Sequence, residues 1–188
     1  MLYSITLKVF SKEGLTMKTV KRIPILIVSI FSICTMLYFS TACAPTATSL
    51  TGSMQLVLDA RQEGIAPKTY TVDLTEYTDK NSVEDVINGL VESSDLYYEG
   101  YKGGYGMFYT ALGYRTQNGE YEQTQYILQQ NPAEGKYIYV YTTVQADKDQ
   151  SNYKTEIEYN GITLINAGMG ISNMHLEDGA TVYFTYIV

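Results

Sequence analysis

The chain has 188 residues, among them 13 Lys+Arg, 20 Asp+Glu, one His, two Cys and no Trp, and its formal net charge is −7. This length gives room for one domain of ordinary size. A single His and two Cys exclude most metal sites built from His and Cys, zinc ribbons and disulfide scaffolds.

The first segment with a clear pattern is an export signal. An uncharged, mostly apolar run covers residues 23–39, and the basic residues Lys18, Lys21 and Arg22 stand just before it. A basic region, an apolar region and an exit of small residues form the secretory pattern. Because Met17 opens this pattern directly, we expect translation to start there rather than at the first residue.

The exit of this run reads Ser40-Thr41-Ala42-Cys43. It resembles the lipobox of bacterial lipoproteins, in which the chain is cut before a Cys whose sulfur carries diacylglycerol. The resemblance implies a signal peptide over 1–42 and lipidation of Cys43, although the lipobox prefers Leu where this chain has Ser40. The alternative is an uncleaved membrane helix, because the run reaches the lower edge of a spanning length, roughly 17–25 residues. Both interpretations place the rest of the chain at the outer face of the bacterial cytoplasmic membrane, since positive charges stay inside.

The remainder of the chain is acidic. After residue 42 it carries 8 Lys+Arg and 19 Asp+Glu, a net charge of −11. Such a charge repels nucleic acid and anionic lipid headgroups, so we expect no nucleic-acid partner and a membrane contact that depends on the lipid or the helix. Small, uncharged residues over 44–52 predict a short tether, 43–52, that precedes a domain over 53–188.

Hydrophobic periodicity predicts a mixed fold for this domain. Apolar residues recur at helical spacing over 83–91, after the capping residue Ser82, whereas 137–144 alternates as a strand does. Two strands, one helix and then several strands predict an α+β fold, with the helix packed on one face of a mixed sheet. We expect strands at 55–59, 70–74, 137–144 and 181–188, a helix at 81–93, a turn at 177–179, and hairpins at Asn118-Gly119 and at Asn160-Gly161, the latter between 155–159 and 162–165.

Five segments together resemble the transcobalamin-type C-terminal domain family. They are SVEDVI (82–87), GMFYTALG (106–113), NGITL (160–164), GMGIS (168–172) and LEDGATV (176–182). The resemblance implies a β-grasp-like fold and a place among bacterial surface lipoproteins. In animal cobalamin carriers this domain covers one face of the corrinoid, so cobalamin is the ligand that the resemblance suggests. This chain lacks the Trp that many members carry near the NG hairpin, and it lacks their helical partner domain.

Tyrosines are the most unusual feature of the domain. Tyr137, Tyr139 and Tyr141 alternate and so share one face of a strand, whereas Tyr101 and Tyr105 flank Gly103-Gly104. One hypothesis is an aromatic surface for a flat ligand that includes Tyr101, Tyr105 and Tyr141. The alternative is that tyrosine replaces Trp and Phe in a half-buried sheet. The glycine-rich segment itself is expected to be a flexible loop or a lid over the ligand.

Asp147, Asp149, Ser151, Thr155 and Glu158 occupy positions 1, 3, 5, 9 and 12 of a twelve-residue calcium loop. Oxygen side chains at this spacing favour calcium binding. The alternative is a solvated polar loop, because the flanking segments read as strands and not as helices.

Little in the domain points to catalysis. The only His is His175, and Gly170-Ile171-Ser172 is a broken version of a nucleophile elbow. We therefore expect an exported, lipid-anchored surface protein with a non-catalytic binding domain. The partner of this domain is expected to be a small flat ligand or a surface protein. The alternatives are a structural or adhesive module and, third, a hydrolase.

Overall fold

A computed structural model describes residues 46–104, 106–119 and 121–187. The export signal, its start at Met17 and the lipidation site Cys43 lie outside the described residues. Residues 47–188 form a compact unit with a hydrophobic core of its own, so we expect this unit to fold alone.

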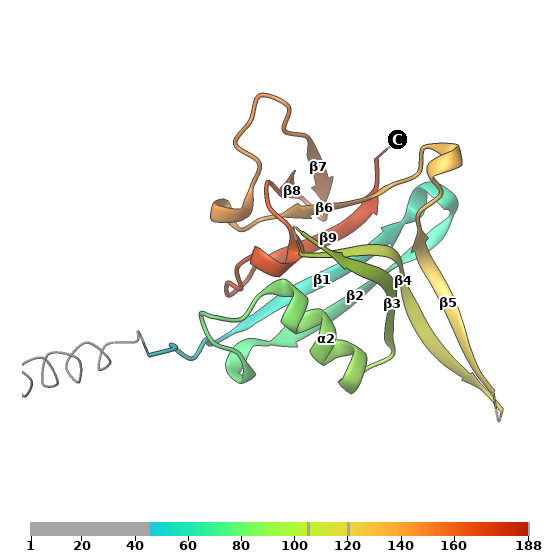
Figure 1. The fold of residues 1–188 in the computed structure, drawn as a ribbon, viewed down its shortest axis with the longest axis horizontal. Coiled ribbons are helices and arrows are strands. Elements are labelled where there is room, and N and C mark those ends of the chain that lie inside the picture. The colour runs from blue at the N-terminus through green and yellow to red at the C-terminus, as the bar shows by residue number, and fades with distance from the viewer. Residues whose placement is uncertain (1–45, 105, 120, 188) are drawn as a thin grey trace, which may run out of the picture. The chain divides into compact units, whose positions relative to one another are not determined.

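The described residues of this unit are mostly sheet with a single α-helix, which confirms the expected α+β class (Figure 1). Short 3₁₀ helices, η1 to η5, connect several strands and begin at Arg61, Leu74, Pro132, Gln145 and Ile171. The main elements are β1 (Ser53–Ala60), β2 (Ile65–Asp73), α2 (Val83–Ser93), β3 (Leu96–Gly103), β4 (Gly106–Asn118), β5 (Tyr121–Gln129), β6 (Ile138–Thr142), β7 (Glu156–Tyr159), β8 (Ile162–Asn166) and β9 (Thr181–Tyr186).

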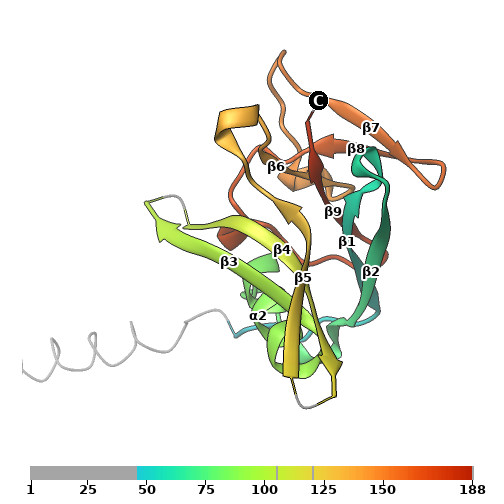
Figure 2. The same cartoon turned by 90° about the vertical axis from the view of Figure 1, so that its right-hand side faces the viewer.

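The strands form two sheets. The larger has the order β2-β1-β9-β6-β8-β7, and the smaller has the order β3-β4-β5. β1 pairs in parallel with β9 and antiparallel with β2, so the last strand of the chain lies beside the first. Figure 2 shows the smaller sheet toward the viewer with α2 behind it.

The helix begins where the sequence places it. The Asp85 carboxylate accepts a hydrogen bond from the Ser82 backbone N–H at 2.7 Å, which satisfies a donor at the start of the helix. Val83, Val86 and Ile87 are buried. The apolar stripe read from the sequence is therefore the side of α2 that packs into the core.

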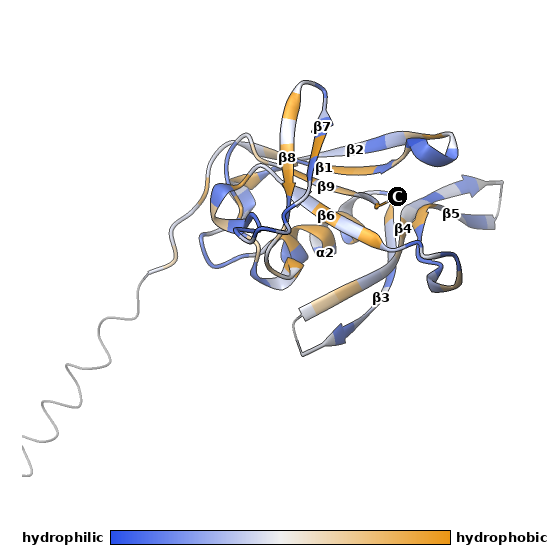
Figure 3. Ribbon diagram, turned by 90° about the horizontal axis from the view of Figure 1, so that it is seen from above, coloured by the Kyte–Doolittle hydropathy of each residue, from blue (hydrophilic) through white to orange (hydrophobic). Residues whose placement is uncertain are grey.

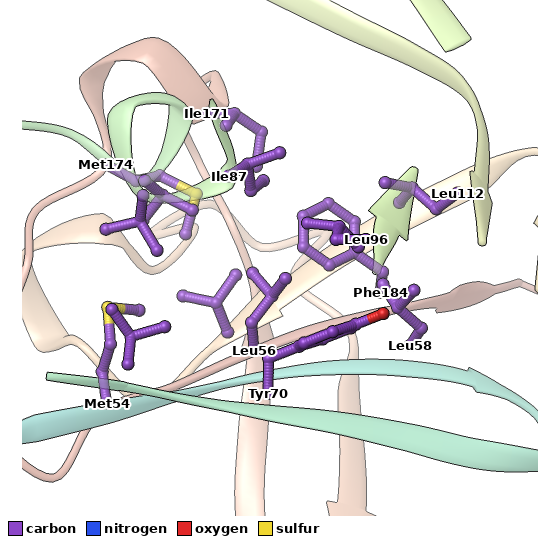
Figure 4. Close-up of a cluster of buried hydrophobic side chains, with 14 of the residues drawn as sticks. Met54, Leu56, Leu58, Tyr70, Ile87, Leu96, Leu112, Ile171, Met174 and Phe184 are labelled. Carbon is purple, nitrogen blue, oxygen red and sulfur yellow. The ribbon is translucent and has the colours of Figure 1, made fainter. Parts of the chain in front are cut away.

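The core lies between the larger sheet, α2 and the inner face of the smaller sheet. Figure 4 shows Leu56 and Phe184 from the larger sheet, Ile87 from α2, and Leu96 and Leu112 from the smaller sheet in one cluster. All five side chains are fully buried. Hydrophobic stretches on α2, β6 and β8 are visible in Figure 3.

Two expectations need revision. The tether predicted over 43–52 extends less far, because Ala47 already belongs to the compact unit, and the backbone N–H of Leu50 donates to the Tyr77 carbonyl at 3.0 Å. The glycine-rich segment expected as a loop or lid forms the paired strands β3 and β4 instead. Glycine occurs in strands where a neighbouring backbone or ring comes too close for a side chain.

Candidate functional site

An aromatic surface covers the outward side of the smaller sheet. We call it the aromatic face. It consists of Tyr97, Glu99 and Tyr101 of β3, Phe108 and Arg115 of β4, and Tyr126 of β5.

Strand alternation explains why these side chains share one side. Leu96 and Tyr98 of β3 point inward and pack in or against the core. Their neighbours Tyr97, Glu99 and Tyr101 therefore point outward. α2 lies on the inner side of this sheet in Figure 2, and no other α-helix of the described residues covers the outward side.

Tyr101 and Phe108 form the first aromatic pair of the face. The two residues are directly opposite each other on β3 and β4. Their ring centroids lie 5.6 Å apart with an interplanar angle of 17°, a stacked arrangement. Tyr101 is nevertheless 60% exposed and Phe108 42% exposed. Since β3 is the edge strand of its sheet, only β4 flanks it within the described residues.

Tyr97 and Tyr126 form the second pair, across a glycine. Both residues are register partners of Gly113 on the central strand β4. Their ring centroids lie 6.0 Å apart at 59°. A Cβ at Gly113 would collide with the backbone oxygen of Gln125, so the close approach of β5 requires glycine here.

Glu99 links the second pair through its carboxylate. Its Oε1 accepts the hydroxyl of Tyr97 at 3.3 Å and also accepts the hydroxyl of Tyr126. The hydrogen bond to Glu99 raises the pKa of Tyr126 to about 12, because the neutral phenol is needed as the donor. Both rings are thus held by one acceptor.

Arg115, the cation among the residues of the aromatic face, contacts a ring of the face and a carboxylate beside it. The Arg115 guanidinium lies 5.1 Å from the centroid of the Tyr97 ring, and its Nε lies 3.6 Å from Glu122 Oε1. These contacts hold the charge against the sheet. Among the residues that the structure describes, the face therefore presents rings, hydroxyls and a carboxylate, but no unpaired cation.

Two of the three tyrosines predicted as a ligand surface, Tyr101 and Tyr141, lie on different sheets. Tyr101 lies on the aromatic face, and Tyr105 lies outside the described residues. Tyr141 is only 2% exposed, and its hydroxyl lies 3.1 Å from Thr155 Oγ1. Tyr141 thus offers no surface to a ligand in this structure, because other side chains cover its strand face.

Sequence reasoning missed Phe108, Arg115 and Tyr126 as members of the face. The signal that could have found them is the alternation of Tyr97, Glu99 and Tyr101 combined with a second hairpin at 118–121. That hairpin is present, since Asn118 pairs opposite Tyr121.

A second tyrosine cluster covers the outward side of the larger sheet, and it includes Tyr141, Tyr159 and Tyr183. Tyr183 is 4% exposed and donates its hydroxyl to the buried Asp59 carboxylate, which also accepts the Arg61 Nε at 2.7 Å. Burial, followed by the bond to Asp59, raises the pKa of Tyr183 to about 12. The tyrosines of this cluster are therefore buried around the Asp59 carboxylate, which has its hydrogen-bond partners within the protein.

The predicted calcium ligands are not gathered around one point. Asp147 is fully buried and accepts the His175 backbone N–H at 2.8 Å, whereas Asp149 accepts the Ser151 backbone N–H at 2.8 Å. Glu158 lies on β7 and accepts the Thr163 hydroxyl at 2.9 Å. Within residues 46–104, 106–119 and 121–187 no group of three or more His, Cys, Asp or Glu could hold a metal ion. The loop spacing fails because η4 and a strand replace the two helices that flank such a loop.

The two residues considered for catalysis have separate partners. His175 Nδ1 lies 2.5 Å from Asp147 Oδ1. The Ser172 hydroxyl instead donates to Glu84 of α2, and it accepts the Met107 backbone N–H at 3.0 Å. Ser172 therefore fastens η5 to the helix and to β4.

A polar hollow of about 360 Å³ lies beside the end of β9. Lys136 lies in it between Glu63 and Glu134, with Nζ to oxygen distances of 2.6 and 3.3 Å. The two carboxylates raise the pKa of Lys136 through these bonds. The hollow thus holds a partly exposed ion-pair network formed by the chain's own side chains.

Comparisons with known proteins add no assignment, because neither a known family model nor a curated protein matches this chain. In the part of the chain that the structure describes, no helix is long and apolar enough to cross a membrane.

Proposed function

We propose that this chain is an exported surface protein, lipid-anchored through Cys43 at the outer face of the bacterial cytoplasmic membrane, whose domain binds a ligand without catalysis. The observation that carries the binding function is the aromatic face. Exposed aromatic rings that gather on one surface are typical of interaction sites. Tyr101 and Phe108 are exposed at 60% and 42%, although each is large and apolar enough to be buried.

We also propose that the fold is β-grasp-like and belongs with the transcobalamin-type C-terminal domains. The strand order supports this proposal. β1 lies between β2 and β9 and is parallel to β9, and α2 follows the β1-β2 hairpin. The smaller sheet is then an addition between the helix and β6, and it is this addition that carries the aromatic face.

The binding function is non-catalytic in this proposal. Ser172 is engaged with Glu84, and His175 is engaged with Asp147, so the two do not form one nucleophile system. A small ligand with a ring that stacks on Tyr101 fits the face, and a corrinoid is the ligand that the family resemblance suggests. Docking of another surface protein is the second candidate, which the unpaired edge of β3 favours.

The binding proposal is tested by calorimetric melting of residues 47–188 with and without excess cobalamin. A ligand at a hundredfold excess over its dissociation constant stabilises a protein by about 2.7 kcal/mol. We expect a higher melting temperature that the Tyr101→Ala variant abolishes. A rise that persists in this variant would place the ligand elsewhere, and no rise would remove cobalamin as the ligand.

The anchor proposal needs a separate test. Expression of the full chain in a bacterium that lipidates its own proteins, with labelled fatty acid, should give a labelled, membrane-bound product. Cys43→Ser should abolish the label and leave a precursor that retains the signal segment from Met17 to residue 42. Equal labelling of both forms would overturn lipidation at Cys43.

A further inference from the structure

We infer that the aromatic face binds a neutral glycan chain, with successive sugar rings packed on Tyr101 of the first aromatic pair and on Tyr126 of the second, which are 60% and 36% exposed. This inference deepens the proposed binding function and rests on it. It is argued from the order of rings, polar groups and charges along β3.

The rings suit the apolar faces of sugars. An aromatic ring carries negative charge on its face. The C–H bonds on one side of a pyranose ring are slightly positive, so this side packs against an aromatic face. Tyr101 stacks on Phe108 and is still 60% exposed, so much of its ring is accessible to a ligand.

The spacing of the two pairs indicates an oligomer rather than a single sugar. Tyr97 and Tyr101 are four residues apart on the same side of β3. A strand rises by about 3.3 Å per residue, which places the two side chains roughly 13 Å apart. One pyranose ring cannot contact both pairs, whereas a short chain of linked sugars can.

Between the two pairs the face offers hydrogen-bond acceptors. Glu99 lies between Tyr97 and Tyr101, and the hydroxyls of Tyr97 and Tyr126 are both directed to its Oε1. Glu99 is an exposed residue, and its second oxygen makes no hydrogen bond within the described residues. Sugar hydroxyls are donors that such a carboxylate oxygen binds.

The charges of the face favour a neutral chain over an acidic one. Arg115, the cation of the face, is engaged with the Tyr97 ring and with Glu122. The whole chain after residue 42 has a net charge of −11. A polyanion would therefore meet repulsion without a free cation to bind it.

The experiment is isothermal titration of residues 47–188 with two neutral tetrasaccharides, cellotetraose and chitotetraose, and with glucose and cobalamin for comparison. We expect one tetrasaccharide to bind and glucose to bind at least tenfold more weakly. Tyr101→Ala and Phe108→Ala should each weaken tetrasaccharide binding by about tenfold, since ring truncation at a contact removes its stacking.

The matched control is Tyr153→Ala. Tyr153 is 89% exposed but lies in the loop before β7, away from the aromatic face. Its removal should leave tetrasaccharide binding unchanged. Thermal melting of each variant confirms that the domain is folded.

The outcomes separate this inference from the proposed function. If neither tetrasaccharide binds but cobalamin binds and depends on Tyr101, the glycan inference is overturned and the binding function stands. Tetrasaccharide binding that Tyr153→Ala weakens as much as Tyr101→Ala would also overturn it. If neither a tetrasaccharide nor cobalamin binds, the glycan inference is rejected, and docking of a surface protein becomes the first candidate for the binding function.

Discussion

The molecule has two tyrosine-rich sheet faces, and they differ in what covers them. On the smaller sheet, Tyr101 is 60% exposed and Tyr126 is 36% exposed. On the larger sheet, Tyr141 is 2% exposed and Tyr183 is 4% exposed. Tyrosines placed by the same strand alternation are thus exposed on the smaller sheet and buried on the larger one.

The β7-β8 hairpin makes this difference. Tyr159 at the end of β7 packs on Tyr183, with ring centroids 4.9 Å apart, and its hydroxyl lies 3.5 Å from Thr69 of β2. The hairpin therefore extends over the larger sheet from β6 toward β2. No equivalent hairpin crosses the aromatic face within the described residues, which leaves that face for a ligand.

The largest effect is expected where the closed face is opened. Tyr183→Ala should destabilise the domain by about 3–5 kcal/mol, because it removes a buried ring and a partner of the buried Asp59. Urea unfolding followed by circular dichroism measures this change. Tyr183→Phe is the control, since it keeps the ring, and it should cost about 1–3 kcal/mol. A loss below 1 kcal/mol in Tyr183→Ala would mean that the hairpin does not close this face.

The contrast between the two faces also shows which features the sequence predicts. The helix at 83–93, the Asn160-Gly161 hairpin and the last strand follow from local signals, and the structure contains all three. The alternation of Tyr137, Tyr139 and Tyr141 indicates a shared face. It says nothing of the hairpin that covers Tyr141, because that contact joins segments distant in the chain.

Local sequence signals also fail to predict the aromatic face. Glycines between 100 and 106 suggest a loop from local propensity, but pairing with β4 makes the segment a strand. Tyr101 could be selected from its neighbourhood in the chain. Its partner Phe108 and the second pair depend on the register of three strands. The predicted calcium ligands show the same dependence on the fold, since Asp147 contacts His175 whereas Glu158 contacts Thr163 in the β7-β8 hairpin.

Alkaline pH should lower the stability of the domain, because a tyrosine on each face has a raised pKa. The pKa of Tyr183 and that of Tyr126 are both raised from 10.0 to about 12. A raised pKa means that the folded state favours the neutral phenol. The corresponding stability is fully present below pH 10 and is lost as the pH rises toward 12. We expect the urea midpoint to fall over this range.

Glu99→Gln sharpens the comparison of the two phenols. The hydrogen bond to Glu99 is the main cause of the shift at Tyr126, whereas burial is the main cause at Tyr183. The variant should lower the pKa of Tyr126 toward 10 and leave the pKa of Tyr183 unchanged. Titration of each tyrosine by NMR measures both values. A fall at Tyr183 would show that the two faces are coupled.

A smaller loss is expected from the turn that directs the covering hairpin. Asn160 and Gly161 have φ values of 50° and 77°, and Tyr159 pairs opposite Ile162. Such a two-residue turn requires the left-handed region at both positions. Gly161→Ala should therefore destabilise the domain by about 1–2 kcal/mol. Gly135→Ala, another exposed turn position with positive φ, is the control for backbone strain alone. Only the change at 161 should also alter the NMR signals of Tyr141 and Tyr183.

The smallest effect on stability is expected at the open face. Tyr101→Ala removes an exposed ring that stacks on Phe108, with centroids 5.6 Å apart. Cross-strand pairs of this kind contribute roughly 0.2–1 kcal/mol, so the loss should stay within that range. Urea unfolding beside Tyr153→Ala, a tyrosine without such a pair, isolates the contribution of the stack. A loss as large as that of Tyr183→Ala would mean that the ring serves the fold. A small loss together with weakened ligand binding is what a surface kept for binding requires, because the ring then stabilises the complex and not the free domain.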